Sequence, residues 1–109
     1  MQHKDRIILQ KVISEIAVGQ QLLGDSGLDE FLHNEMQKRA VSMTVINIGE
    51  LIKNISDELR LDNPHIPWKA IAGMRDLAAH KYQTLRMEDV YNTAKIDFPE
   101  LKRLLEALL

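Results

Sequence analysis

The longest unbroken helical pattern in the chain runs from about Glu35 to Leu61, and it constrains the fold more than any other stretch. Its apolar residues are spread over more than one helix face: Met36, Ala40, Met43, Ile46, Ile48, Leu51, Ile55 and Leu59. A helix that is apolar on two sides needs two packing partners. One partner is the core of the same chain, and we expect the second to be another subunit of a helical dimer. Gly49 predicts a close helix crossing, with a merely tolerated glycine as the alternative.

Apolar residues recur at helical spacing in the rest of the chain too. The segments are about Lys4 to Leu23, Leu28 to Leu32, Pro67 or Trp68 onward, Arg86 to about Ile96, and Asp97 to Leu109. In the last segment, Asp97 is predicted to cap a helix that carries Pro99 in its first turn. Small residues after Trp68, among them Gly73, are expected to leave room for a neighbouring backbone. We therefore predict an all-α fold in one domain that spans residues 1–109.

The composition excludes several classes of protein. The chain has 109 residues and no cysteine, which leaves neither a disulfide framework nor a thiolate metal site and favours a reducing cytoplasm. No apolar run approaches the roughly 20 residues of a membrane span, so we expect a soluble, unprocessed protein without a membrane partner. The formal net charge of -2 argues against a general nucleic-acid coat, because affinity for polyanions comes from clustered Lys and Arg. Any contact with nucleic acid must be local.

Arg75, His80 and Tyr82 are the candidate functional residues. A guanidinium binds phosphate oxygens in a bidentate fork, and an imidazole can gain or lose a proton near neutral pH. On a helix that turns about 100° per residue, Arg75 and Tyr82 lie nearly above each other, whereas His80 lies about 140° from Arg75. Asp76 precedes His80 by four residues, where its carboxylate can accept a hydrogen bond from the ring and fix the tautomer. Taken one at a time, the arginine and the histidine also fit a solvated helix surface.

Other kinds of site leave no trace in the sequence. His3, His33 and His65 are scattered without the spacing of metal ligands, and no paired carboxylates accompany them. The chain has no Gly-rich phosphate loop and no Gly-x-Ser-x-Gly elbow. We therefore predict that the protein binds no metal and no cofactor.

Three stretches together resemble the HepT type of HEPN-domain protein: IGELIKNISDEL, PxIPWKAIAGMRDLAAHKY and FPELKRLLEALL. The resemblance covers nearly the whole chain. It implies an up-and-down bundle of four to five helices that dimerises, so that the Arg-x-x-x-x-His motifs of two subunits face one cleft. Gln83 and Thr84 depart from the family pattern, in which an aromatic residue and a glycine follow the tyrosine.

Proteins of this type are RNases that need no metal. The resemblance implies that Arg75 binds phosphate and stabilises transition-state charge, and that His80 transfers protons. Tyr82 matches the tyrosine that a minimal nucleotidyltransferase antitoxin, of the MNT type, modifies with AMP. The structural alternative for Tyr82 is a ring that packs at the dimer seam with its hydroxyl in water.

The sequence thus favours a homodimeric RNase toxin that acts on RNA and is neutralised by a cognate nucleotidyltransferase. The alternative is a non-catalytic HEPN subunit that binds nucleotide or substrate for the nucleotidyltransferase, or regulates it. The acidic balance of the chain favours this alternative, and the intact trio of Arg75, His80 and Tyr82 favours the enzyme.

Overall fold

The computed structural model describes residues 1–79 and 86–109, and only the backbone of residues 75–79. These residues form helices joined by turns, and no strand occurs among them, which confirms the predicted all-α class. The helices are α1 (His3–Leu23), α2 (Leu28–Leu32), α3 (Glu35–Ile52), α4 (Asp57–Asp62), α5 (Trp68–Ala79), α6 (Met87–Asn92) and α7 (Phe98–Glu106), with a π-helical turn at Thr93–Asp97. Within this described part, no helix is long and apolar enough to span a membrane.

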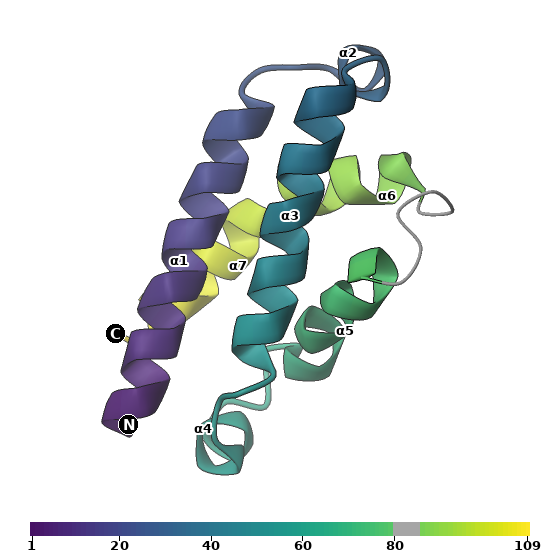
Figure 1. The fold of residues 1–109 in the computed structure, drawn as a ribbon. Helices are drawn as coiled ribbons and strands as arrows, with labels where there is room; N and C mark the ends of the chain where they lie inside the picture. Colours follow the sequence, from purple (N-terminus) through teal and green to yellow (C-terminus); the bar gives the residue numbers. More distant parts are fainter. Residues whose placement is uncertain (80–85) are drawn as a thin grey trace.

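The helices α1 and α3 form an antiparallel pair to which the rest of the chain is added (Figure 1). Between them, Gly24 ends α1 with a φ of 55°, a conformation that glycine adopts at no steric cost. Asn34 then starts α3, since its side chain accepts a hydrogen bond from the N–H of Gln37 at 2.9 Å. On the other side of α3 lies α5, and α7 packs against α1.

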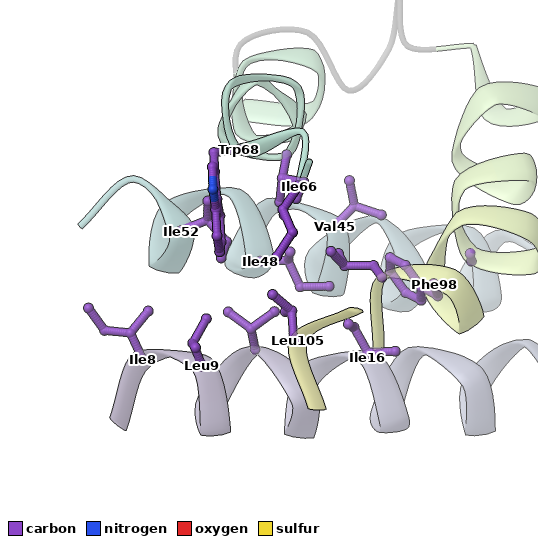
Figure 2. Packing of buried hydrophobic residues seen from close by; sticks show 14 of the residues in the cluster. Ile8, Leu9, Ile16, Val45, Ile48, Ile52, Ile66, Trp68, Phe98 and Leu105 are labelled. Carbon is purple, nitrogen blue, oxygen red and sulfur yellow. The ribbon is translucent and has the colours of Figure 1, made fainter. Parts of the chain in front are cut away.

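The core lies between α1, α3, α5 and α7 (Figure 2). Its largest fully buried side chains include Phe31, Phe98, Leu9, Ile16, Ile48, Ile52 and Leu105. They come from both helices of the central pair, from α7 and, for Phe31, from α2, so the apolar sides of these helices meet in one cluster.

The predicted continuous helix from Glu35 to Leu61 is wrong, because the chain breaks between Ile52 and Asp57. The reason is tertiary. Ser56 starts α4 by accepting the Leu59 N–H at 3.2 Å, and Asp5 of α1 holds Ser56 in place through two hydrogen bonds. A guanidinium N–H of Arg60 donates to the carbonyls of Ile52 and Lys53 at 3.3 and 3.1 Å and so satisfies the end of α3.

The last helix, α7, begins at Phe98 directly after Asp97 and carries Pro99 in its first turn, as predicted, but the predicted capping by the Asp97 side chain is wrong. Asp97 has helical dihedral angles and makes no capping hydrogen bond, and α6 continues through the π-helical turn into α7. The N–H of Phe98 donates to the carbonyl of Thr93, five residues back, which widens the helix just before Pro99. A proline in a helix lacks one donor, and this wider turn takes up the change of register. The last helix ends at Glu106, three residues before the expected end at Leu109.

A close helix approach occurs at Gly19, which was not predicted from the sequence. A Cβ at Gly19 would lie 2.6 Å from Cε2 of Phe98 and 2.9 Å from Oγ1 of Thr44. Gly49 is buried within α3, as a close crossing requires. Gly73 differs from the expectation, because a Cβ there would meet no atom of the described residues within 4 Å. A side chain at residue 73 would therefore extend into open space beside α5.

Candidate functional site

The helix α5 carries the first half of the candidate site. It begins at Trp68 as predicted, and the first helical bond runs from the Ile71 N–H to the Pro67 carbonyl at 3.0 Å. Trp68 is 6% exposed, and its indole N–H donates to the carbonyl of Asn63 at 3.0 Å. Trp68 lies beside Ile52, at the end of α3 (Figure 2). The start of α5 is thus fixed firmly against the core.

The structure places Arg75 and Asp76 on the backbone of α5, which ends at Ala79. His80 and Tyr82, together with the departures Gln83 and Thr84, lie outside the described residues. The spacing between Arg75 and His80 and the hydrogen bond from Asp76 to His80 therefore stay predictions.

The chain that follows this segment is anchored by α6. The hydroxyl of Ser42 in α3 donates to the thioether of Met87 at 3.8 Å, and Ser42 is 2% exposed. The Tyr91 hydroxyl donates to the carbonyl of Ser26 at 3.0 Å. The rings of Tyr91 and Phe31 lie 5.5 Å apart at a tilt of 47°, a favourable aromatic arrangement. Tyr91 is thus a structural residue that joins α6 to the loop between α1 and α2.

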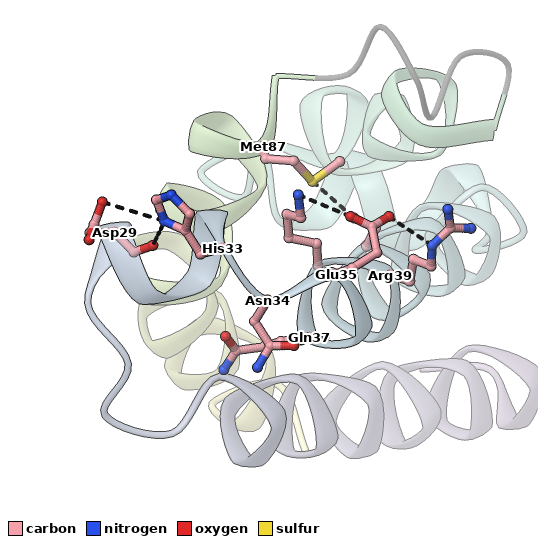
Figure 3. Close-up of polar contacts among 9 residues, drawn as sticks. Asp29, His33, Asn34, Glu35, Gln37, Arg39 and Met87 are labelled. Carbon is pink, nitrogen blue, oxygen red and sulfur yellow. Dashed lines mark hydrogen bonds and ion pairs between the residues drawn. The ribbon is translucent and has the colours of Figure 1, made fainter.

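Charged side chains lie near the start of α3 (Figure 3). Glu35 accepts a hydrogen bond from Nε of Arg39 at 2.9 Å, and its second oxygen lies 3.1 Å from Nζ of Lys38. These cations were not among the residues predicted from the sequence. In the sequence, Lys38 and Arg39 are two adjacent cations in an acidic chain. This pattern is only a weak sign of a functional site, because adjacent charges usually belong to a solvated helix face.

Two surface hollows are lined by residues that the structure describes. A groove of about 600 Å³ runs between α1 and α3, where the Asn47 amide donates to the carboxylate of Glu15 at 2.8 Å. A hollow of about 250 Å³ lies between the first half of α5 and α7, lined by Ile71, Met74 and Leu101 among others.

An arginine–glutamate pair on α7 provides a comparison for the pair on α3. The Arg103 guanidinium donates hydrogen bonds to Glu100, which lowers the pKa of the Glu100 carboxyl and raises the pKa of Arg103. The two side chains are mostly exposed, so solvent screens this pair. Among the residues that the structure describes, no group of three or more His, Asp or Glu side chains could hold a metal ion. The predicted metal independence is not tested by that finding.

The sequence matches the model of the HepT-like family, described as ribonuclease HepT-like, over residues 12–108. A relative from Thermococcus cleftensis named "Probable ribonuclease HepT" is 31% identical over 97% of this chain and 94% of its own length. Two Methanocaldococcus jannaschii proteins, named as candidate RNases MJ0125 and MJ1216, are 39% and 40% identical. They match 78% and 74% of this chain and 73% and 67% of their own lengths.

No solved structure matches the chain significantly. The family match spans most of the chain, including the segment from Arg75 to Tyr82, and a helical fold accompanies it. The chain therefore belongs to the HepT-like ribonuclease family.

Proposed function

We propose that this protein is a metal-independent endoribonuclease with Arg75 and His80 as its catalytic residues. The observation that carries the proposal is the family match over residues 12–108, within which both residues lie. Relatives that this chain matches over most of their own length are named as RNases.

The chemistry suits these two side chains. In RNA, the 2′-oxygen attacks the neighbouring phosphorus, forming a bond to it while the bond to the 5′-oxygen breaks. A proton leaves the 2′-hydroxyl and another reaches the 5′-oxygen, and a histidine can assist such transfers. Charge that develops on the phosphoryl oxygens is stabilised by a guanidinium. The products are a 2′,3′-cyclic phosphate and a 5′-hydroxyl end.

A homodimer is part of the proposal, because it lets Arg75 of one subunit work with His80 of the other. Support comes from α3, whose Met36 and Met43 are 83% and 55% exposed. These residues belong to the second apolar side that the sequence analysis attributed to this helix. A large apolar side chain left exposed on an otherwise packed helix favours a partner there.

Regulation completes the proposal. A cognate MNT-type nucleotidyltransferase antitoxin attaches AMP to Tyr82 and thereby silences the toxin. The added bulk and negative charge beside the phosphate site exclude RNA by sterics and repulsion. The chain has two tyrosines, and the hydroxyl of Tyr91 already donates a hydrogen bond to the Ser26 carbonyl. This structural role of Tyr91 supports Tyr82 as the AMP acceptor.

The test is cleavage of RNA by the purified protein in EDTA, with mass spectrometry of the product ends. We expect cyclic phosphate ends, and we expect His80→Ala to lose about 100-fold to 10,000-fold in rate while remaining folded. Activity that persists in His80→Ala, or that EDTA abolishes, contradicts the assignment. Absence of cleavage with tight nucleotide binding points instead to the non-catalytic HEPN subunit, which the net charge of -2 favours.

A further inference from the structure

The exposed side of α1 carries a lysine and a glutamate that are not paired with each other. Lys11 precedes Glu15 by four residues, a spacing at which two side chains can meet on a helix surface. Glu15 instead accepts a hydrogen bond from the side-chain amide of Asn47 on α3 at 2.8 Å. Among the residues that the structure describes, Lys11 is exposed and makes no ion pair. Its charge is therefore open to a carboxylate from outside the chain.

Both charges lie in the groove of about 600 Å³ between α1 and α3. The bond from Asn47 goes to Oε1 of Glu15 and holds the carboxylate in the groove. A carboxylate accepts hydrogen bonds at both of its oxygens, so Glu15 can bind a cation at the same time. The groove is also lined by Ile7, Gln10 and Ser14 from α1 and by Glu50 and Leu51 from α3.

Exposed apolar residues flank the two charges on α1. Ile7 and Val18 are 37% and 44% exposed, and the turn of about 100° per residue puts both on the stripe that carries Lys11 and Glu15. Ile7 precedes Lys11 by four residues, and Val18 follows Glu15 by three. Reading the stripe in the opposite direction exchanges the cation and the carboxylate and keeps an apolar residue at each end. The stripe is therefore complementary to a second copy of itself that runs antiparallel.

The apolar surface continues from α1 onto α3. A Cβ at Gly19 would lie 2.9 Å from Oγ1 of Thr44, so the residues next to them, Val18 and Met43, lie at the same level of the antiparallel pair (Figure 1). Met43 is exposed and precedes Asn47 by four residues, which places it on the side of α3 that lines the groove. The exposed side of α3 that supports the proposed homodimer thus adjoins the stripe on α1.

A two-fold axis brings the same surface of two copies together, so every contact between two residues occurs twice. When two α1 helices pack antiparallel across an axis near Ser14, Lys11 of each copy faces Glu15 of the other. We propose that two copies of this chain associate through the α1–α3 groove in this register. The inference rests on the homodimer of the proposed function and deepens it by naming the surface and the charge pairs.

The size of this surface suits a dimer. The 21 residues of α1 make a helix about 31 Å long, and α3 lies beside it. A face of that length and two helices wide is comparable with the roughly 800 Å² that each partner buries in a standard interface. The small side chain of Ser14 near the axis lets the two α1 helices approach closely. The apolar residues contribute affinity, whereas the charge pairs fix the register.

The first experiment measures the mass of the full chain by light scattering over a range of micromolar concentrations. We expect a dimeric parent protein. Lys11→Glu and Glu15→Lys should each raise the Kd of the dimer about 100-fold or more, because each like-charge contact occurs twice across the axis. An equimolar mixture of the two variants should dimerise again, since every facing pair in the mixed dimer has opposite charges.

The chain offers a matched control in Lys69. It is an exposed lysine on α5, outside the groove, and Lys69→Glu changes the net charge by the same amount as Lys11→Glu. Its Kd should stay within about twofold of the parent value, because exposed charges far apart are screened by salt. Thermal melting confirms that each variant folds. Glu15→Lys also loses the bond from Asn47, so Lys11→Glu decides the test if Glu15→Lys does not fold.

Ser14→Cys reads the register independently. The chain has no cysteine, so the introduced thiol is the only one. Two cysteines can form a disulfide when their Cα atoms lie within about 7 Å, which two residues near the axis satisfy. We expect a covalent dimer on a non-reducing gel after mild oxidation, and its loss when Lys11→Glu is added. Lys69→Cys should remain monomeric on the same gel.

The outcomes separate this inference from the proposed function. A dimeric parent protein that is unchanged by Lys11→Glu, or that Ser14→Cys does not link, overturns the α1 register and leaves the homodimer standing. Failure of the two folded charge variants to dimerise when mixed overturns the pairing of Lys11 with Glu15. A monomeric parent protein overturns the register and the homodimer together, while RNA cleavage by that protein leaves its assignment as a nuclease intact.

Discussion

The carboxylate of Asp5 accepts two hydrogen bonds from Ser56, one from the backbone N–H at 2.9 Å and one from the hydroxyl at 2.5 Å. Asp5 lies in the first turn of α1 and is 1% exposed, while Ser56 caps α4. One side chain thus joins the beginning of the chain to the break between α3 and α4. The break sets the direction in which the chain proceeds toward α5 and its candidate site.

Asp5→Ala is expected to lower the free energy of unfolding by about 1–3 kcal/mol, because the partly buried N–H and hydroxyl of Ser56 lose their acceptor. Urea denaturation followed by circular dichroism measures the change. Asp62→Ala removes an exposed carboxylate at the end of α4 and should stay within about 0.5 kcal/mol of the parent. Equal losses in the two variants contradict a specific role for the Asp5 contact.

Gly19→Ala and Gly73→Ala are expected to change stability in opposite directions. The new methyl group at residue 19 clashes with Phe98 and Thr44, and overpacking of this kind costs about 1–3 kcal/mol. At residue 73 the methyl group meets no described atom, so the better helix propensity of alanine adds about 0.5–1 kcal/mol. Urea denaturation of both variants gives the signs. Loss of dimer in Gly73→Ala would reveal a partner backbone against α5, and an undiminished stability in Gly19→Ala contradicts the close packing at α1.

Arg75→Lys separates charge from geometry in the candidate site. Lysine keeps the positive charge but loses the planar fork that matches phosphate oxygens. We expect RNA cleavage to fall by about tenfold to 100-fold, in line with a lost hydrogen bond to a charged group of about 1.5–3 kcal/mol. Steady-state kinetics measure the loss, with Arg103→Lys as the control that keeps the parent rate. Full activity in Arg75→Lys means that charge alone suffices.

Tyr82→Phe is expected to escape modification by the cognate nucleotidyltransferase and ATP, because the acceptor oxygen is gone while the ring remains. Tyr91→Phe is the matched control. It should still gain AMP at the parent rate but lose about 0.5–1.5 kcal/mol of stability, since the hydroxyl no longer reaches the Ser26 carbonyl. Intact-mass spectrometry counts the added AMP, and urea denaturation measures the stability. Modification of Tyr82→Phe at the parent level places the acceptor elsewhere.

Met43→Lys is expected to convert the dimer into a monomer, because it puts a charge on the exposed apolar side of α3. Ile96→Lys makes the same change at another exposed apolar residue, 64% exposed in the π-helical turn, and should leave the dimer intact. Light scattering at micromolar concentration reports the mass. A monomeric parent protein removes the shared-cleft proposal altogether.

Local patterns in the sequence were enough to predict most helices. The apolar stripe of α1 gave bounds within one residue of the observed His3–Leu23, and Pro67 marked the start of α5 at Trp68. Both features act over a few residues: helical periodicity places apolar side chains on one face, and proline fixes the backbone before a first turn. The stretches IGELIKNISDEL, PxIPWKAIAGMRDLAAHKY and FPELKRLLEALL likewise led to the HepT-like family that the comparison confirmed.

Contacts between distant residues decided what the local patterns missed. Asp5 and Ser56 are 51 positions apart, and their hydrogen bonds stabilise a break where the apolar pattern continues. Gly19 is an unremarkable helical glycine until Phe98 and Thr44 are packed against it. Helical periodicity determines which face of each helix is buried, whereas the position of one helix against another depends on side chains far apart in the chain.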